Sequence, residues 1–413
     1  MKRLLGAPLE WLSRFESRYL KAARWKPAIT SLGGYGSETE ARVLGRVLMT
    51  LRGSERSWLI EKRGWRQFFD TQVPREPVLI KLGKTVQVLR TDSGGYIDAT
   101  LCGHGLKSGW HDAEIYLIHR SDLRGHEREL AKTKDGIELA RLGLELGIRL
   151  TRPTRIPVRI LGSEETVGIV SDVDDTVMVS MVPHKLLALR YAFVDKVSSR
   201  QTVPGMSHFL RALRRDIPRL GPPESKQVRV PLMFLSTGAW NTITVLRHFL
   251  RSRNFPRATI LLRPWGMSAQ GLPSRGPAFK RKELERLVGM FPQVRWILIG
   301  DNGQHDPEIF TAFAKSHPGA VAAIAIRTLL PFQHISAHGS PAERTSLQVS
   351  DLPPGLPVIF GSDGYHLLRE AQTTRFRAQL SRRLRTAWPE GPSASLSPPT
   401  PNTTTLWLRV VAR

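Results

Sequence analysis

The chain has 413 residues, a formal net charge of +25 and a single cysteine. One cysteine excludes an intramolecular disulfide and favours a reducing environment, so we predict a cytoplasmic protein that is either soluble or peripheral to a membrane. The charge favours anionic partners such as acidic lipid, phosphorylated substrates or nucleic acid, although a genome-wide bias toward arginine would produce the same excess.

Residues 1–30 are predicted to form an amphipathic helix. Apolar side chains of this stretch fall close to one helical face: Leu5, Leu9, Leu12, Phe15 and Tyr19. Such a helix either lies on an anionic membrane or docks on the protein's own body, which is the commoner use of an apolar stripe. Charges at Glu10 and Arg14 argue against a secretory signal. No stretch approaches the ~20 apolar residues of a membrane-spanning helix.

Residues 31–164 are predicted to form a small antiparallel β domain. Short apolar runs at 78–80, 86–88 and 115–117 are separated by glycine-rich turns. This pattern is typical of strands joined by tight turns. Three histidines in the region lack the paired spacing of a zinc site, so we interpret them as surface or core residues.

Residues 165–370 alternate apolar strands with helices. Strands are predicted at 167–171, 230–235, 258–262, 295–299 and 321–326, and helices at 184–195, 204–215, 240–252, 279–290 and 307–316. Such alternation predicts an α/β fold with a parallel sheet covered by helices on both faces. Sites in these sheets lie at the carboxyl ends of the strands.

The end of the chain is basic and then rich in proline, serine and threonine. Residues 371–388 are predicted to form a basic helix, which either binds phosphates or lipid or is simply solvated. Residues 389–413 are predicted to be a disordered tail.

A cluster of carboxylates follows the strand predicted at 167–171, in the run Asp172-Val173-Asp174-Asp175-Thr176. Like charges this close repel and raise one another's pKa, so a cation, usually a metal, is expected among them. In phosphoryl transfer one carboxylate attacks phosphorus and a neighbour moves the proton. The alternative interpretation is an acidic turn after a strand.

Three later segments carry further groups that phosphoryl transfer uses. The hydroxyl of Ser236, in Ser236-Thr237-Gly238, can donate to a phosphoryl oxygen with help from the amides of the turn. Lys280, or alternatively Lys282, opens a helix and can neutralise developing charge. Asp301 and Asp306 suit Mg²⁺, which takes hard oxygen ligands, although the same run also reads as an Asn-Gly turn capped by Asp306.

Taken in this order, the segments resemble the phosphatidate phosphatases of the yeast actin-patch-protein type, a branch of the haloacid dehalogenase superfamily. The resembling stretches are 171–177, 203–206, 235–240 and 298–310, of which the last is the most specific. Stretches at 35–47 and 91–96 resemble the β region that precedes the catalytic domain in bacterial members. The chain departs from the family pattern at 236–240, 279–280 and 300–302, and none of these departures removes a charged catalytic group.

The resemblance implies a haloacid-dehalogenase-like catalytic domain and a role for each residue. Asp172 would form an aspartyl-phosphate, and Asp174 would move the proton. Ser236 and Lys280 would hold the phosphoryl oxygens. The implied substrate-binding residues are Thr176, Thr237 and Gly238. The implied Mg²⁺ ligands are Asp172, Asp174 (through its carbonyl), Asp301 and Asp306.

Three functions fit these residues. The first, implied by the resemblance, is a Mg²⁺-dependent phosphatidate phosphatase that releases diacylglycerol from phosphatidic acid and touches anionic membranes peripherally. The second is a phosphatase for a soluble phosphomonoester or a nucleic-acid end, with nucleic acid not the first choice of partner. The third is a non-catalytic module that binds anionic membranes, against which the intact carboxylates argue. The short spans 177–230 and 238–279 leave little room for a cap domain, which suits a phosphate displayed on something large.

Overall fold

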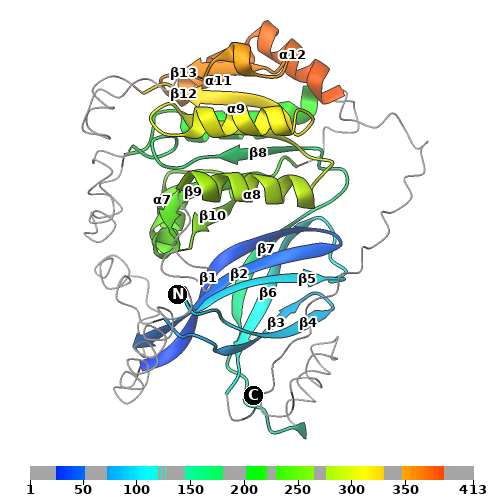
Figure 1. Ribbon diagram of the computed structural model, residues 1–413, viewed down its shortest axis with the longest axis vertical. Coiled ribbons are helices and arrows are strands. Elements are labelled where there is room, and N and C mark those ends of the chain that lie inside the picture. Colours follow the sequence, from blue (N-terminus) through cyan, green and yellow to red (C-terminus); the bar gives the residue numbers. More distant parts are fainter. Residues whose placement is uncertain are drawn as a thin grey trace, which may run out of the picture.

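The computed structural model describes residues 25–51, 72–119, 122, 126, 145–179, 201–220, 229–264, 276–329 and 347–385. In this part of the chain a seven-stranded sheet precedes a six-stranded sheet with its helices (Figure 1). None of the described helices is long and apolar enough to cross a membrane. The predicted helix at 184–195 and the predicted tail at 389–413 lie outside the described residues.

The first sheet has the strand order β4-β3-β6-β7-β1-β2-β5. Its strands are β1 (Trp25–Ser37), β2 (Glu40–Leu51), β3 (Pro77–Leu82), β4 (Thr85–Arg90), β5 (Tyr96–Cys102), β6 (Gly109–Leu117) and β7 (Thr154–Leu161). Neighbours pair antiparallel except β1 and β7, which pair parallel, so the sheet is mixed where the sequence predicted an antiparallel one. The hydroxyl of Thr85 donates to the carbonyl of Cys102 over 2.8 Å, which brings the two terminal strands together around an apolar core.

The start of the first sheet corrects the last six residues of the predicted N-terminal helix, 25–30. Residues 25–30 lie in β1, where Trp25 to Ser31 pair with residues 45–51 of β2. Their ladder of backbone hydrogen bonds with a distant strand overrides the local helical pattern, because tertiary pairing dominates weak propensity. Residues 1–24 lie outside the described part of the chain.

The second sheet is parallel throughout, which confirms the predicted α/β class. Its order is β10-β9-β8-β11-β12-β13. The strands are β8 (Val167–Ser171), β9 (Leu232–Ala239), β10 (Thr259–Arg263), β11 (Arg295–Asp301), β12 (Val321–Arg327) and β13 (Val358–Gly361). The central strand β8 is buried along its whole length, as expected of a parallel strand covered on both faces. Gly168 is required here because a Cβ would lie 2.4 Å from the indole of Trp296.

Helices cover both faces of this sheet. One face packs against α6 (Met206–Asp216), α7 (Ile243–Ser252), α11 (Gly364–Gln372) and α12 (Thr374–Arg385). The other packs against α8 (Gly276–Met290) and α9 (Asp306–Ser316), which lie in front of the sheet in Figure 1. Short 3₁₀ turns occur at 217–220, 240–242 and 349–351.

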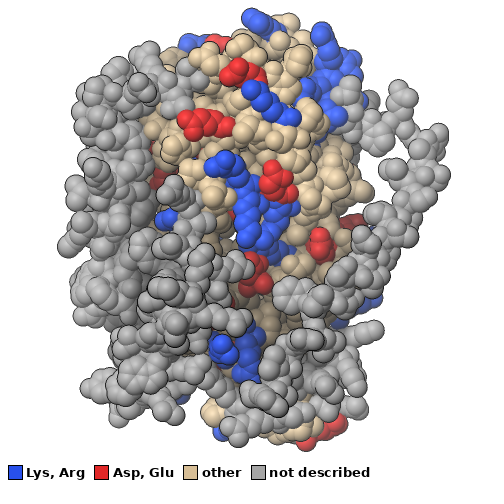
Figure 2. Space-filling model, viewed as in Figure 1, with Lys and Arg blue, Asp and Glu red and all other residues tan. Residues whose placement is uncertain are grey.

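The basic C-terminal helix is part of this packing. Three apolar side chains of α12, those of Phe376, Leu380 and Leu384, are buried in the core that α6 also joins. Basic residues occupy the outer side of the helix, at the upper right of Figure 2. The predicted domain boundary at 370 falls inside α11, and α11 and α12 pack into the same core.

Candidate functional site

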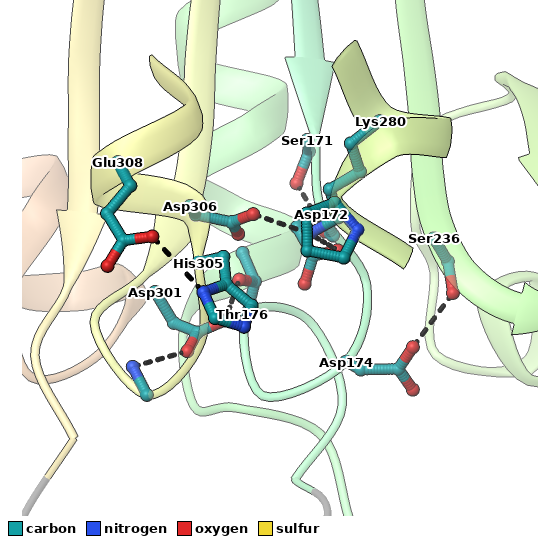
Figure 3. Close-up of polar contacts among 12 residues, drawn as sticks. Ser171, Asp172, Asp174, Thr176, Ser236, Lys280, Asp301, His305, Asp306 and Glu308 are labelled. Atoms are coloured by element: carbon teal, nitrogen blue, oxygen red, sulfur yellow. Dashed lines mark hydrogen bonds and ion pairs between the residues drawn. The ribbon is translucent and has the colours of Figure 1, made fainter. Parts of the chain in front are cut away.

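Four charged residues that are far apart in the sequence meet at the carboxyl end of the parallel sheet (Figure 3). Asp172 follows β8 and Asp301 ends β11, and these two strands are neighbours. The amide of Asp172 donates to the carbonyl of Ile299 over 2.8 Å, which fixes one strand end against the other. Asp306 opens α9 and Lys280 lies in the second turn of α8. The two acidic segments predicted from the sequence therefore form one site.

Asp172, Asp301 and Asp306 form the acidic centre. One carboxylate oxygen of each lies within 4.8 Å of the others, and all three side chains are buried. Burial raises the pKa of Asp172 well above its usual range, Lys280 opposes this, and the neighbouring carboxylates add to it. Burial also raises the pKa of Asp301, with a further contribution from Asp306. The arrangement is costly without a cation, because like charges are held together away from water.

Two oxygens of the acidic centre show where a cation would be held. Oδ2 of Asp172 and Oδ2 of Asp306 are buried and have no hydrogen-bond partner among the described residues. Buried carboxylate oxygens are normally hydrogen-bonded, so these two are available to bind a ligand. Carboxylate oxygens are the ligands that Mg²⁺ prefers, and the donor set fits that ion.

Lys280 is the cation that the chain itself supplies. Its Nζ lies 2.6 Å from Oδ1 of Asp172 and 2.5 Å from Oδ1 of Asp306, and the residue is only 3% exposed. Burial alone would lower the pKa of Lys280, but the two carboxylates outweigh it and raise that pKa. An ammonium group has three donors, so one remains for a ligand oxygen. Lys282, the alternative candidate, is exposed and lies outside the site.

Asp174 and Ser236 form a separate pair beside the acidic centre. The hydroxyl of Ser236 donates to Oδ2 of Asp174 over 2.8 Å and accepts from the amide of Gly238 over 2.9 Å. A hydroxyl carries one proton, so in this arrangement Ser236 orients Asp174 rather than reaching a phosphoryl oxygen. The side chain of Asp174 does not join the three-carboxylate group, which leaves its carbonyl as the group implied for a metal.

The two threonines predicted to bind substrate have different surroundings. The hydroxyl of Thr176 donates to Oδ2 of Asp301 over 3.1 Å and is fully buried, so Thr176 orients a carboxylate. Thr237 is half-buried beside the start of α8, where a Cβ added to Gly276 would lie 3.0 Å from the Thr237 methyl carbon. Of the two, Thr176 is the one that contacts the acidic centre.

The carboxylate of Asp306 can lie close to the backbone of β11 because residue 300 is a glycine. A Cβ on Gly300 would lie 2.4 Å from Oδ2 of Asp306 and 2.8 Å from the ring of Phe310. Asp306 is also the first residue of α9, where the helix dipole stabilises a carboxylate. His305 is exposed, and its ring pairs with Glu308 at 3.2 Å.

Arg327 is a site residue that the sequence analysis missed. It ends β12, is 2% exposed, and its guanidinium donates to the carbonyl of Asp175 and to that of Ser362. Asp175 has a φ of 58°, a left-handed conformation that costs energy in a residue with a Cβ. Arg327 therefore holds the turn that carries Asp172 and Asp174. The sequence contains a pattern that could have identified Arg327, because it is the first polar residue after the apolar run 321–326.

Comparisons with known proteins match the segment that carries this site. Residues 167–328 match the family model described as the catalytic domain of phosphatidate phosphatase APP1. The resemblance seen in the motifs is confirmed over this segment. The three carboxylates of the acidic centre and Lys280 fall within it, whereas the seven-stranded sheet lies outside it.

Two curated relatives show similarity of the same extent. Phosphatidate phosphatase APP1 of Saccharomyces cerevisiae is 26% identical over 163 residues, which are 39% of this chain and 26% of that protein. An uncharacterized protein of Schizosaccharomyces pombe is 25% identical over 165 residues, 40% of this chain and 25% of that protein. The matched region thus spans about a quarter of the length of either relative.

Proposed function

We propose that the protein is a Mg²⁺-dependent phosphatidate phosphatase, which hydrolyses phosphatidic acid to diacylglycerol and phosphate. The observation that carries the proposal is the buried group of Asp172, Asp301 and Asp306, two of which pair with Lys280. The similarity of residues 167–328 to a phosphatidate phosphatase catalytic domain supports both the reaction class and the lipid substrate.

A divalent cation would be held by the three carboxylates together with the carbonyl of Asp174. Two of these carboxylates have a buried oxygen without a hydrogen-bond partner among the described residues, which supports a ligand at that point. When bound, Mg²⁺ would offset the carboxylate charge and polarise the phosphoryl group. Thr176 and the amide of Gly303, which donate to Asp301 over 3.1 and 2.7 Å, would keep that carboxylate oriented.

The chain's own residues then carry two displacement steps. In the first, a carboxylate oxygen of Asp172 forms a bond to phosphorus while the bond from phosphorus to the lipid oxygen breaks. Asp174 gives its proton to that leaving oxygen, and Ser236 holds Asp174 in place. In the second, Asp174 takes a proton from water as the water oxygen bonds to phosphorus, which frees Asp172 and releases phosphate. The third donor of Lys280 stabilises negative charge on the phosphoryl oxygens.

Phosphate release from three substrates would test the proposal. Phosphatidic acid in mixed micelles, a soluble aryl phosphate and a 5′-phosphorylated oligonucleotide are compared with and without Mg²⁺. We expect turnover of phosphatidic acid that requires Mg²⁺ and exceeds the other two. A preference for the oligonucleotide or the aryl phosphate would replace the lipid substrate, and inactivity on all three would favour a binding module.

The same assay identifies the nucleophile. Asp172→Asn is expected to lower kcat by about four decades or more, as nucleophile deletions do in other enzymes. Asp351→Asn changes an exposed aspartate on a 3₁₀ turn and serves as the matched control, with activity near that of the wild type. Substantial turnover by Asp172→Asn would reject the assignment of the nucleophile.

A further inference from the structure

An ion-pair network joins the seven-stranded sheet to helix α8, three residues from Lys280. Arg42 of β2 donates to both carboxylate oxygens of Asp98 on β5, over 2.6 and 2.8 Å. The remaining terminal nitrogen, Nη1, donates to Oε2 of Glu283 over 2.7 Å. Arg42 is 8% exposed and Glu283 3% exposed, so the pair is shielded from solvent. A bidentate Arg–Asp contact fixes the guanidinium plane and therefore the direction in which it meets Glu283.

Tyr35 of β1 strengthens the same junction. Its hydroxyl donates to Oε2 of Glu283 over 3.4 Å and accepts from Arg42 over 3.1 Å. Burial raises the pKa of Tyr35 to about 12, so the hydroxyl keeps its proton and remains a donor. The ring is fully buried in the same apolar cluster as Phe279, Leu284 and Leu287 of α8. A residue of the first sheet is thus part of the core beneath α8.

The spacing of residues along α8 places the ion-pair network of Arg42 and Glu283 next to Lys280. Residues three apart in a helix lie on the same side, so Lys280 and Glu283 are neighbours. Lys280 faces Asp172 and Asp306 while Glu283 faces Arg42. Glu285, the other nearby glutamate of this helix, is exposed. Rotation or sliding of α8 would therefore break the contacts of Glu283 and of Lys280 together. In Figure 1, α8 lies on the side of the parallel sheet that borders the first sheet.

We propose that Arg42 and Glu283 are positioning residues for Lys280, and that the seven-stranded sheet serves the reaction by holding α8 in register with the acidic centre. The inference rests on the proposed phosphatase function and deepens it. The sheet lies outside the matched catalytic segment and contributes no group to the acidic centre, but through Arg42 it fixes the lysine that does. A displacement of about 1 Å in such a group can cost roughly 100-fold in rate.

The test compares two buried arginines of the first sheet. Arg42→Met removes the arginine of the first sheet that pairs with Glu283 and leaves the pair of Glu283 with Arg286, within α8, in place. Arg159→Met removes the arginine that pairs with Glu165, which precedes β8 at the end opposite Asp172. Both arginines are nearly buried, 8% and 6% exposed, so both variants are expected to lower the melting temperature. Activity is measured as phosphate release from phosphatidic acid in mixed micelles at saturating Mg²⁺, well below either melting temperature.

The expected result separates positioning from stability. Arg42→Met should lower kcat by about 10- to 100-fold with little change in KM, because the lysine is displaced rather than the substrate pocket lost. Glu283→Gln should act in the same direction, and Arg42→Lys should recover part of the activity because it keeps a charge that can pair with Glu283. Arg159→Met should retain the kcat of the wild type.

A double variant then asks whether Arg42 acts through Lys280. In the Lys280→Met background, adding Arg42→Met should leave kcat unchanged, since the group it positions has gone. An unchanged kcat in Arg42→Met alone, or the same loss of rate in both backgrounds, would overturn the inference. Absence of phosphate release by the wild type would instead reject the proposed function, so the two failures are distinguishable.

Discussion

Lys280 and Lys282 lie two residues apart on α8 and have opposite surroundings. One is buried between two carboxylates, and the other is exposed. Lys280→Met is expected to lower kcat by at least about 100-fold, the scale seen when one donor to a developing charge is removed. Lys282→Met should leave kcat close to wild type. Comparable losses in the two variants, measured as phosphate release, would contradict the assignment.

A second prediction for a single residue concerns Gly300. The Cβ that Gly300→Ala adds would lie 2.4 Å from Oδ2 of Asp306, so either the carboxylate or the backbone must shift. Overpacking of this kind costs about 1–3 kcal/mol of stability, and the shifted carboxylate should weaken Mg²⁺ binding. Gly319→Ala is the control, because a Cβ there meets nothing within 4 Å. Calorimetric titration with Mg²⁺ checks the affinity, and unaltered binding in Gly300→Ala would refute the prediction.

Individual residues could be predicted only where a local motif defined them. Asp172, Asp301 and Asp306 each end a strand or open a helix, and parallel strands bring such positions to one edge. The choice between Lys280 and Lys282 required the rotation of α8 against the sheet, which no local pattern contains. Likewise, the hydrogen bond from Ser236 to Asp174 joins neighbouring strands and depends on their register.

At the level of elements, α12 shows how a basic helix can be a core helix. Leu380→Ala is expected to lower the free energy of unfolding by about 2–5 kcal/mol, because the side chain is 1% exposed in the core shared with α6. Arg382→Ala, on the exposed side, should change it by less than about 0.5 kcal/mol. Urea unfolding measures both. A neutral Leu380→Ala would mean that α12 is not packed as described.

Elements with long apolar runs could be predicted from the sequence. Short strands, and strands that depend on pairing with a distant segment, could not. The strand predicted at 167–171 matches β8, and those at 295–299 and 321–326 lie within β11 and β12, since continuous burial leaves a continuous apolar signal. β13 has only four residues, two of them partly exposed, and was missed. Residues 25–30 were assigned to a helix because their strand character comes from pairing with β2.

For the whole molecule, the acidic centre predicts that Mg²⁺ stabilises the fold. A ligand that binds only the folded state adds about 2.7 kcal/mol at 100 times its Kd, so Mg²⁺ should raise the melting temperature and a chelator should reverse the rise. The increase should be lost in Asp306→Asn and kept in Asp351→Asn, whose side chain is exposed. Differential scanning fluorimetry at constant ionic strength is the measurement. An equal rise in both variants would exclude binding at this centre.

The order of strands in the parallel sheet places the proposed nucleophile directly after one of its two innermost strands. β8 and β11 are the innermost pair, flanked by β10 and β9 on one side and by β12 and β13 on the other. Local unfolding begins at the edge strands of a sheet, where it costs the least free energy. Opening of β10 or β13 would thus leave the hydrogen bond from the amide of Asp172 to the carbonyl of Ile299 intact, and the site would stay assembled. We therefore expect heat to abolish activity only when the central strands unfold, so thermal inactivation should coincide with global unfolding rather than precede it.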